Sequence, residues 1–298
     1  MTLWILFALG AAILWTLVNL ADKYIIGHEC RDPLIATTTL STIHFTVFSL
    51  VAVFTRTELH TDPLVLFYAF MIGALITITN FLYYRSLSGG DVSKVVPLFS
   101  TAPLFALILG AVFLGERFSP HAYVGVTLIT IGAVVISMKR LKHHLALEPI
   151  AFAALAVALA SAIRSVLFKS AGVHATTWEL LFWIGVFTLV TAIPLILAHH
   201  VHLSDFKNTL FRKGFEHFLI TDTLNALGFL SLFVALSLGP ITLVTAILHT
   251  KPLVVFVLAM AIDVLWPSIL REKMTKRLVL QKTIGTILIV IGAFLVIR

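Results

Sequence analysis

Charged side chains inside long apolar runs are the residues of this sequence with the clearest capacity for chemistry. Lys251 lies near the middle of the apolar run 241–264, directly before Pro252. A charged side chain near the centre of a membrane costs about 2.5 to 3.5 kcal/mol and usually faces a cavity or a partner. We therefore expect Lys251 to bind a carboxylate or phosphate group of a small-molecule ligand. The alternative is a structural ion pair with Asp222.

The run 215–238 carries an acid and an amide on one helical face, because Asp222 and Asn225 are three residues apart. This pair could bind a ligand amine, relay a proton or neutralise Lys251. Polar packing between helices is an equally supported alternative. His249 precedes Lys251 by two residues. Because histidine readily exchanges protons at physiological pH, His249 is a candidate for proton coupling, with a hydrogen bond that packs two helices as the alternative.

Five further side chains inside apolar runs are candidates for lining a binding cavity. They are His44, Arg164, Asn19, Asn80 and Tyr83. Arg164 shares a helical face with Phe168, but its long side chain could also extend to the membrane surface. Asn19 shares a face with Trp15, and amide and aromatic groups together suit amphipathic metabolites. For Tyr84, and as the alternative for Tyr83, we expect a place in the aromatic belt at the membrane interface.

Prolines interrupt two of the apolar runs at corresponding places. Pro97 and Pro103 lie in the run 92–114, and Pro252 lies in the run 241–264. Proline removes a backbone donor and kinks or ends a helix. Paired interruptions in two halves of a chain point to a ligand site in transporters. We therefore expect helix breaks or hinges at these residues, with a static kink as the alternative.

Several function classes are disfavoured by the motif content. The sequence has no His-Glu-x-x-His helix, no phosphate-binding loop ending in Gly-Lys-Ser/Thr and no Gly-x-Ser-x-Gly turn, so we expect neither a soluble-enzyme active site nor a cofactor. The loop histidines lack the carboxylate or cysteine companions of a metal site, so no metal is expected. They are His143, His144, His199, His200 and His202. The net charge is +7, but the basic residues are dispersed between apolar runs, so we expect no nucleic-acid partner.

The elements that position these residues are predicted to be membrane-spanning helices. Of the 298 residues, 59% are hydrophobic and only 12% are charged, whereas soluble domains have about 25% charged residues. Apolar runs cover 3–24, 34–54, 65–86, 92–114, 120–138, 149–170, 177–198, 215–238, 241–264 and 279–297. Each has roughly the 20 residues that a spanning helix needs and is about twice as long as a barrel strand. The predicted fold class is therefore an all-α membrane protein of about ten transmembrane helices.

The ten runs divide into two similar halves of five, residues 1–140 and 146–298. The glycine spacing of the fifth run recurs in the tenth, where Gly285 and Gly292 correspond to Gly125 and Gly132. An odd number of spans in each half means that the second half enters the membrane in the opposite orientation. Such inverted repeats bind a substrate near the midplane between the halves, which open alternately to each side.

The first half resembles the EamA-type modules of the drug/metabolite transporter superfamily. The resemblance rests on Asp91-Val92-Ser93, Val96-Pro97, Pro103, Leu114-Gly115-Glu116-Arg117 and Gly132-Ala133. It is weaker in the second half, where the Leu-Gly-Glu motif is lost and Lys251 precedes the proline. The resemblance implies a ten-helix secondary transporter with a central cavity lined by both halves. Its relatives handle amino acids, sugars and their nucleotide conjugates, organic cations and phosphorylated metabolites.

We therefore predict a secondary transporter of a small polar metabolite, driven by protons or by exchange for a counter-substrate. One alternative is an intramembrane enzyme or lipid-handling protein that uses His249 and Asp222 as acid and base. Another is a passive channel or an assembly subunit. The sequence leaves the substrate, the coupling ion, the direction of transport and the oligomeric state open.

The predicted location is the lipid bilayer of the cell (inner) membrane, with an organellar membrane as the alternative. Most loop lysines and arginines follow odd-numbered runs, which places both termini outside by the positive-inside rule. Members of the family that the chain resembles more often have cytoplasmic termini, so the orientation has two interpretations.

Overall fold

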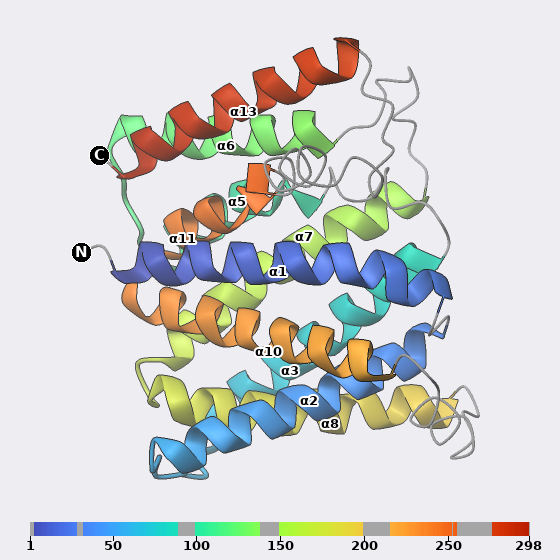
Figure 1. The fold of residues 1–298 in the computed structure, drawn as a ribbon. Helices are drawn as coiled ribbons and strands as arrows, with labels where there is room; N and C mark the ends of the chain where they lie inside the picture. Colours follow the sequence, from blue (N-terminus) through green and yellow to red (C-terminus); the bar gives the residue numbers. More distant parts are fainter. Residues whose placement is uncertain are drawn as a thin grey trace. The chain divides into compact units, whose positions relative to one another are not determined.

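The computed structural model describes residues 3–28, 32–88, 99–137, 149–198, 215–251, 253–254 and 276–297. Within these ranges the chain forms ten α-helices and no strand (Figure 1). The helices are α1 (Leu3–His28), α2 (Pro33–Phe54), α3 (Pro63–Ser88), α5 (Ala102–Leu114), α6 (Pro120–Ser137), α7 (Pro149–Ala171), α8 (Thr177–Ala198), α10 (Phe215–Leu238), α11 (Ile241–Leu248) and α13 (Lys276–Ile297).

The observed helix ends follow local sequence signals. Asp32 caps α2, since its carboxylate accepts a hydrogen bond from the backbone N–H of Leu34 at 2.8 Å. Pro33 then occupies the first turn, where its missing N–H leaves no bond unmade. Proline also begins α3, α6 and α7. These starts lie close to the predicted ones, and α10 has the predicted bounds.

Several of the described helices are long and apolar. Four of them are long and apolar enough to cross a membrane, in the ranges Pro33–Phe54, Pro63–Arg85, Thr177–Pro194 and Glu216–Leu238. Shorter apolar helices cover Leu3–Asn19, Ala102–Leu114, Pro120–Ile136 and Leu280–Val296. The predicted class of all-helical membrane protein is confirmed for the part of the chain that the structure describes.

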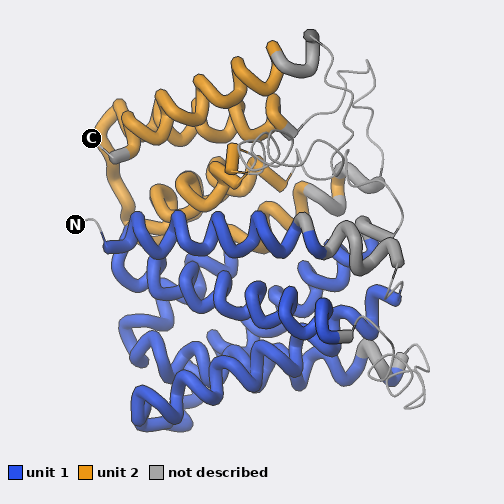
Figure 2. The backbone as a smooth tube through the Cα atoms, viewed as in Figure 1, with its two compact units in different colours: residues 1–91, 163–239 blue, residues 92–162, 240–298 orange. Residues whose placement is uncertain are grey.

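The chain forms two compact units, and each unit combines segments from both halves of the sequence (Figure 2). Unit 1 comprises residues 1–91 and 163–239, and unit 2 comprises 92–162 and 240–298. Unit 1 therefore contains α1, α2, α3, α8, α10 and the second part of α7. The proposed repeats 1–140 and 146–298 are a different division of the chain and remain a prediction.

In unit 1, small residues let helices approach one another closely. A Cβ atom added at Gly228 of α10 would meet Trp15 Nε1 at 2.6 Å, so the indole of α1 lies directly on the α10 backbone. Gly185 of α8 lies against the backbone of Phe45 in α2 in the same way, with its added Cβ 3.1 Å from Phe45 Cα. Packing of this kind through small residues is typical of helices within membranes. It brings the polar side chains of unit 1 close together.

In unit 2, α6 and α13 lie side by side and meet through their recurring glycines (Figure 1). A Cβ added at Gly125 would be 2.7 Å from Gly292 O, and one added at Gly292 would be 2.6 Å from Gly125 O. Gly132 and Gly285 oppose each other similarly, at 2.6 and 2.9 Å. The earlier glycine of α6 meets the later glycine of α13, so the two helices run antiparallel.

Turns adjoin α5 and α11 in unit 2. Residues 100–101 form a turn before α5, and residues 249–250 form a turn after α11. In the first turn Leu104 N donates to Thr101 O at 3.0 Å, and in the second Leu253 N donates to Thr250 O at 2.9 Å. Residues that correspond in the two predicted halves thus make the same backbone hydrogen bond.

Candidate functional site

Trp15 of α1 and Asn225 of α10 form a buried polar contact in unit 1. The indole Nε1–H of Trp15 donates to Asn225 Oδ1 at 3.2 Å and lies 3.4 Å from Asn225 O. Gly228, one turn further along α10, gives the indole the space that this contact requires. The amide predicted to line a cavity is therefore oriented by an aromatic donor from another helix.

Phe229 connects this contact to two further predicted site residues. Its ring lies edge-on to Trp15, with centroids 4.9 Å apart at 76°, and edge-on to His44, at 4.9 Å and 85°. The guanidinium carbon of Arg164 lies over the same ring, 5.0 Å from its centroid. We call Trp15, His44, Arg164, Asn225 and Phe229 the Arg164 cluster. It draws on α1, α2, α7 and α10, and all five residues belong to unit 1.

Arg164 is buried without an acidic partner in the described part of the chain. Its side chain is 6% exposed, so the alternative that it extends to the membrane surface is wrong. The Nε atom of Arg164 makes no hydrogen bond in the described residues. The guanidinium group of Arg164 instead makes a cation–π contact with Phe229. Such a contact contributes about 2 kcal/mol when desolvated. Burial of a charge costs several kcal/mol, which is more than this contact returns. Arg164 is therefore suited to bind an anion.

His44 presents two further unused polar atoms beside the same ring. It is 0% exposed, and neither ring nitrogen has a hydrogen-bond partner in the described residues. Its ring stacks on Phe48 at 5.6 Å and 9°. In either neutral tautomer one ring nitrogen is a donor, so His44 can give a hydrogen bond to a ligand that reaches the cluster.

A second polar group in unit 1 lies one helical turn away from the Arg164 cluster along α1 and α10. Tyr83 donates its hydroxyl hydrogen to Asn19 Oδ1 at 2.9 Å, and Tyr84 donates to Asp222 Oδ1 at 3.3 Å. Tyr84 is 0% exposed. Its predicted place in an interfacial aromatic belt is therefore wrong, because the buried acid of α10 binds its hydroxyl. Asn80, on α3, has a buried Nδ2 that makes no hydrogen bond within the described ranges.

Lys251 and His249 belong to unit 2, whereas Asp222 belongs to unit 1. That Lys251 and His249 lie near Asp222 therefore stays a prediction. His249 is the C-cap residue of α11 and is buried. Lys251 is half-buried and directly follows the turn 249–250.

Pro103 is buried in the first turn of α5, where its lack of an N–H has no cost. Pro97 and Pro252, like the loop histidines, lie outside the described residues.

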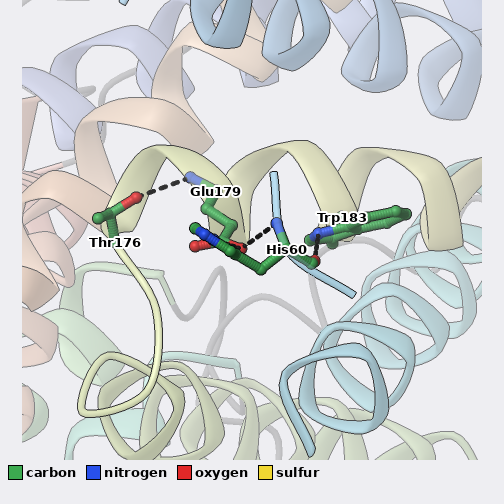
Figure 3. Close-up of polar contacts among 4 residues, drawn as sticks. All are labelled: His60, Thr176, Glu179 and Trp183. Carbon is green, nitrogen blue, oxygen red and sulfur yellow. Dashed lines mark hydrogen bonds and ion pairs between the residues drawn. The ribbon is translucent and has the colours of Figure 1, made fainter. Parts of the chain in front are cut away.

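Glu179 anchors the connection between α2 and α3 to the start of α8 (Figure 3). Its Oε1 accepts hydrogen bonds from the backbone N–H of His60 at 2.8 Å and lies 3.2 Å from His60 Nδ1. Trp183 donates its Nε1–H to His60 O at 3.1 Å, and Glu179 N donates to Thr176 Oγ1 at 3.3 Å. Our sequence interpretation did not include this group. The Thr-x-x-Glu pattern at 176–179 was its available signal, since it favours a helix start.

Glu116 has a structural role in unit 2. Its carboxylate accepts hydrogen bonds from Ile241 N at 2.6 Å, Thr242 N at 3.2 Å and Thr242 Oγ1 at 2.8 Å. Free N–H groups at a helix start favour a negative charge. Glu116 thus caps α11, and both of its carboxylate oxygens accept hydrogen bonds there.

Metal binding has no support in the described part of the chain, where no three acidic, histidine or cysteine side chains come together in a group that could hold an ion.

Phe229, which connects the Arg164 cluster, was missed by the sequence interpretation. Its spacing of four residues from Asn225 places both on one face of α10 and was the available signal.

Residues 2–138 match the model of the EamA-like transporter family. The chain is 36% identical over 78 residues to an uncharacterized protein of Methanocaldococcus jannaschii, covering 26% of this chain and 57% of that protein. It is 40% identical over 57 residues to the uncharacterized transporter YwfM of Bacillus subtilis, covering 19% of either chain. Both matches span less than two thirds of the relative's own length.

A protein of known crystal structure shares the fold. The TM-score is 0.71 at 20% sequence identity, and the match covers 98% of this chain and 95% of the other. At this identity the similarity shows the fold alone.

Proposed function

We propose that the chain is a secondary transporter that moves a small polar metabolite by alternating access, because residues 2–138 match the model of the EamA-like transporter family. The proposed molecule has ten spans in two inverted repeats of five. It works in the cell (inner) membrane, and its transport is driven by protons or by exchange for a second substrate. Transport, and not catalysis, is its activity.

The antiparallel packing of α6 against α13 is the observation that carries this proposal. These helices are the fifth run of one sequence half and the last run of the other, and their contact is reciprocal at two glycine pairs. A twofold axis in the membrane plane between inverted repeats produces such a reciprocal contact between equivalent helices. The matching turns at 100–101 and 249–250 support the same symmetry. Inverted repeats provide two conformations of similar energy, which alternating access requires.

We propose a substrate with a carboxylate or phosphate group. Two buried or half-buried cations support this, Arg164 in unit 1 and Lys251 in unit 2. Asn225 and Asp222 add directional hydrogen bonds on α10. An enzyme that uses His249 and Asp222 would consume the ligand without moving it, and a channel would show flux that does not saturate.

Substitution of Lys251 tests the site in unit 2. We expect Lys251→Ala to abolish uptake into proteoliposomes of the ligand that most raises the melting temperature of the purified protein, in a panel of amino acids, organic acids, nucleotide sugars and sugar phosphates. The physical reason is the loss of one of the two cations, Arg164 and Lys251, that attract the anionic ligand. Arg117→Gln, which changes an exposed cation, is the control and should transport normally. Full uptake by Lys251→Ala would remove Lys251 from the site.

A further inference from the structure

Arg164 of the Arg164 cluster is a buried positive charge for which the described residues supply no negative partner. A guanidinium that is 6% exposed has no acidic partner in the described ranges, and its Nε makes no hydrogen bond. A buried guanidinium remains charged because its proton affinity is too high for it to be neutralised in proteins. Burial of a charge without a counter-charge is strongly unfavourable. The position of Arg164 therefore calls for an anion that the protein's own described side chains do not supply.

His44 supplies a second donor for the same anion. Arg164 and His44 both contact the ring of Phe229, at 5.0 and 4.9 Å from its centroid. Both ring nitrogens of His44 are buried without a hydrogen-bond partner in the part of the chain described. Two orphan donors on two different helices, α7 and α2, thus converge on one aromatic ring.

Further aromatic rings adjoin the cluster. Trp15 contacts Phe229 edge-on, and Phe233 lies 6.1 Å from Phe229, ring centroid to ring centroid. Phe168 contacts Phe233 at 4.4 Å. Rings of this kind stabilise an apolar or aromatic ligand body through their area and their edge contacts. The phenylalanine rings offer no donors for a polyhydroxylated sugar.

The charge of the cluster favours a single negative charge on the ligand. Arg164 is the one formally charged member of the five residues, so a monoanion leaves the site neutral, whereas a dianion leaves a buried charge unpaired. Guanidinium groups also bind planar carboxylates through two parallel hydrogen bonds.

The position of Asp222 argues against an α-amino acid at this cluster. Asp222 precedes Phe229 by seven residues on α10, which is about 10 Å along the helix axis. An α-amino acid carries its ammonium on the carbon next to its carboxylate, so a carboxylate held beside Phe229 leaves that ammonium far from the acid. Asp222 is in addition bonded to Tyr84.

We infer that the Arg164 cluster binds an organic monocarboxylate with an apolar, preferably aromatic, body, and that Arg164 and His44 hold its carboxylate. This inference rests on the proposed transport function and specifies the substrate class for it. Trp15 and Phe229 contact the ligand body, and Asn225, fixed by Trp15, orients it.

Binding measurements on the purified full chain test the inference. The probes are 3-phenylpropanoate, its uncharged amide, phenylalanine, succinate and glucose 6-phosphate, each followed by thermal shift and by titration calorimetry. In the wild type we expect 3-phenylpropanoate to bind at least tenfold more tightly than the other four. We expect Arg164→Met to lose at least tenfold in affinity for 3-phenylpropanoate, and Arg117→Gln to lose none.

A readout without ligand separates binding from folding. Because Arg164 leaves no acidic partner unpaired among the residues that the structure describes, Arg164→Met should keep its melting temperature or raise it. A large fall in that temperature would assign Arg164 a structural role and overturn the inference. Equal binding of acid and amide, preference for phenylalanine or a dianion, or full affinity in Arg164→Met would also overturn it. Tight monocarboxylate binding without transport would instead contradict the proposed function alone.

Discussion

At the scale of single residues, the arrangement of unit 1 depends on a few contacts between distant parts of the sequence. Trp15 and Asn225 are 210 positions apart and share a hydrogen bond. The sequence indicated that Asn19, Asn225, His44 and Arg164 are unusual, because polar groups within apolar runs are costly. It could not indicate their partners. Tyr84 was assigned to the membrane interface for that reason, since its acid, Asp222, lies on another helix.

The role of Phe229 could not be predicted from the sequence either. The chain has 23 phenylalanines, so residue type alone does not distinguish the one whose ring contacts Trp15, His44 and Arg164. A polar residue stands out in an apolar run, whereas an aromatic residue acquires its role only from tertiary contacts.

Substitution of Gly228 tests the contact that holds Trp15. We expect Gly228→Ala to lower the free energy of unfolding by about 1 to 3 kcal/mol, the usual cost of overpacking a tight contact. The added Cβ would lie 2.6 Å from Trp15 Nε1 and 2.7 Å from Trp15 Cδ1, so the indole must move away from Asn225. Thermal unfolding of the purified protein measures the change.

Gly172→Ala is the matched control for this substitution. A Cβ at Gly172 meets backbone oxygens at 3.4 and 3.6 Å, which is ordinary contact, and the melting temperature should stay near that of the wild type. If Gly228→Ala were as stable as Gly172→Ala, the close approach of α1 to α10 would be wrong.

At the scale of helices, the sequence predicted more than it did for single residues. Continuous apolar runs predicted the positions of α2, α8 and α10 within a residue or two, because composition and caps determine where a membrane helix begins and ends. The prolines predicted interruptions, and the turns at 100–101 and 249–250 each end two residues before a proline, Pro103 and Pro252. The common glycine spacing predicted that α6 and α13 are related. That these two helices contact each other could not be predicted from the spacing.

A double-mutant cycle tests the reciprocal glycine contact. Gly132→Ala and Gly285→Ala should each destabilise the protein by about 1 to 3 kcal/mol, because each added Cβ meets a backbone oxygen of the opposite helix, at 2.6 and 2.9 Å. Once one substitution has separated the helices, the second costs less. The double variant should therefore be less destabilised than the sum of the two single variants.

Thermal unfolding of the four proteins gives the coupling energy. Strict additivity would show that the two glycines do not share one contact, and the antiparallel packing of α6 on α13 would lose its support.

At the scale of the whole molecule, the chain is a helical membrane protein whose residues 2–138 match the EamA-like transporter family. Its compact units each draw on both sequence halves, since residues 163–239 join the first unit and 240–298 join the second. Interleaving of this kind requires both halves to be present before either unit is complete. The proposed repeat symmetry, the buried cation of the Arg164 cluster and the turns beside α5 and α11 support our proposal of a carrier that binds one ligand and exposes it alternately to the two sides.

Counterflow in proteoliposomes tests this central claim most directly. Vesicles are loaded with an excess of the unlabelled ligand that gives the largest thermal shift, diluted, and supplied with a trace of labelled ligand outside. An alternating-access carrier predicts transient accumulation of label above its equilibrium level, with a rate that saturates and with the label recovered chemically unchanged. Uptake that never exceeds equilibrium and rises linearly with concentration, or recovery of the label as a product, would contradict it.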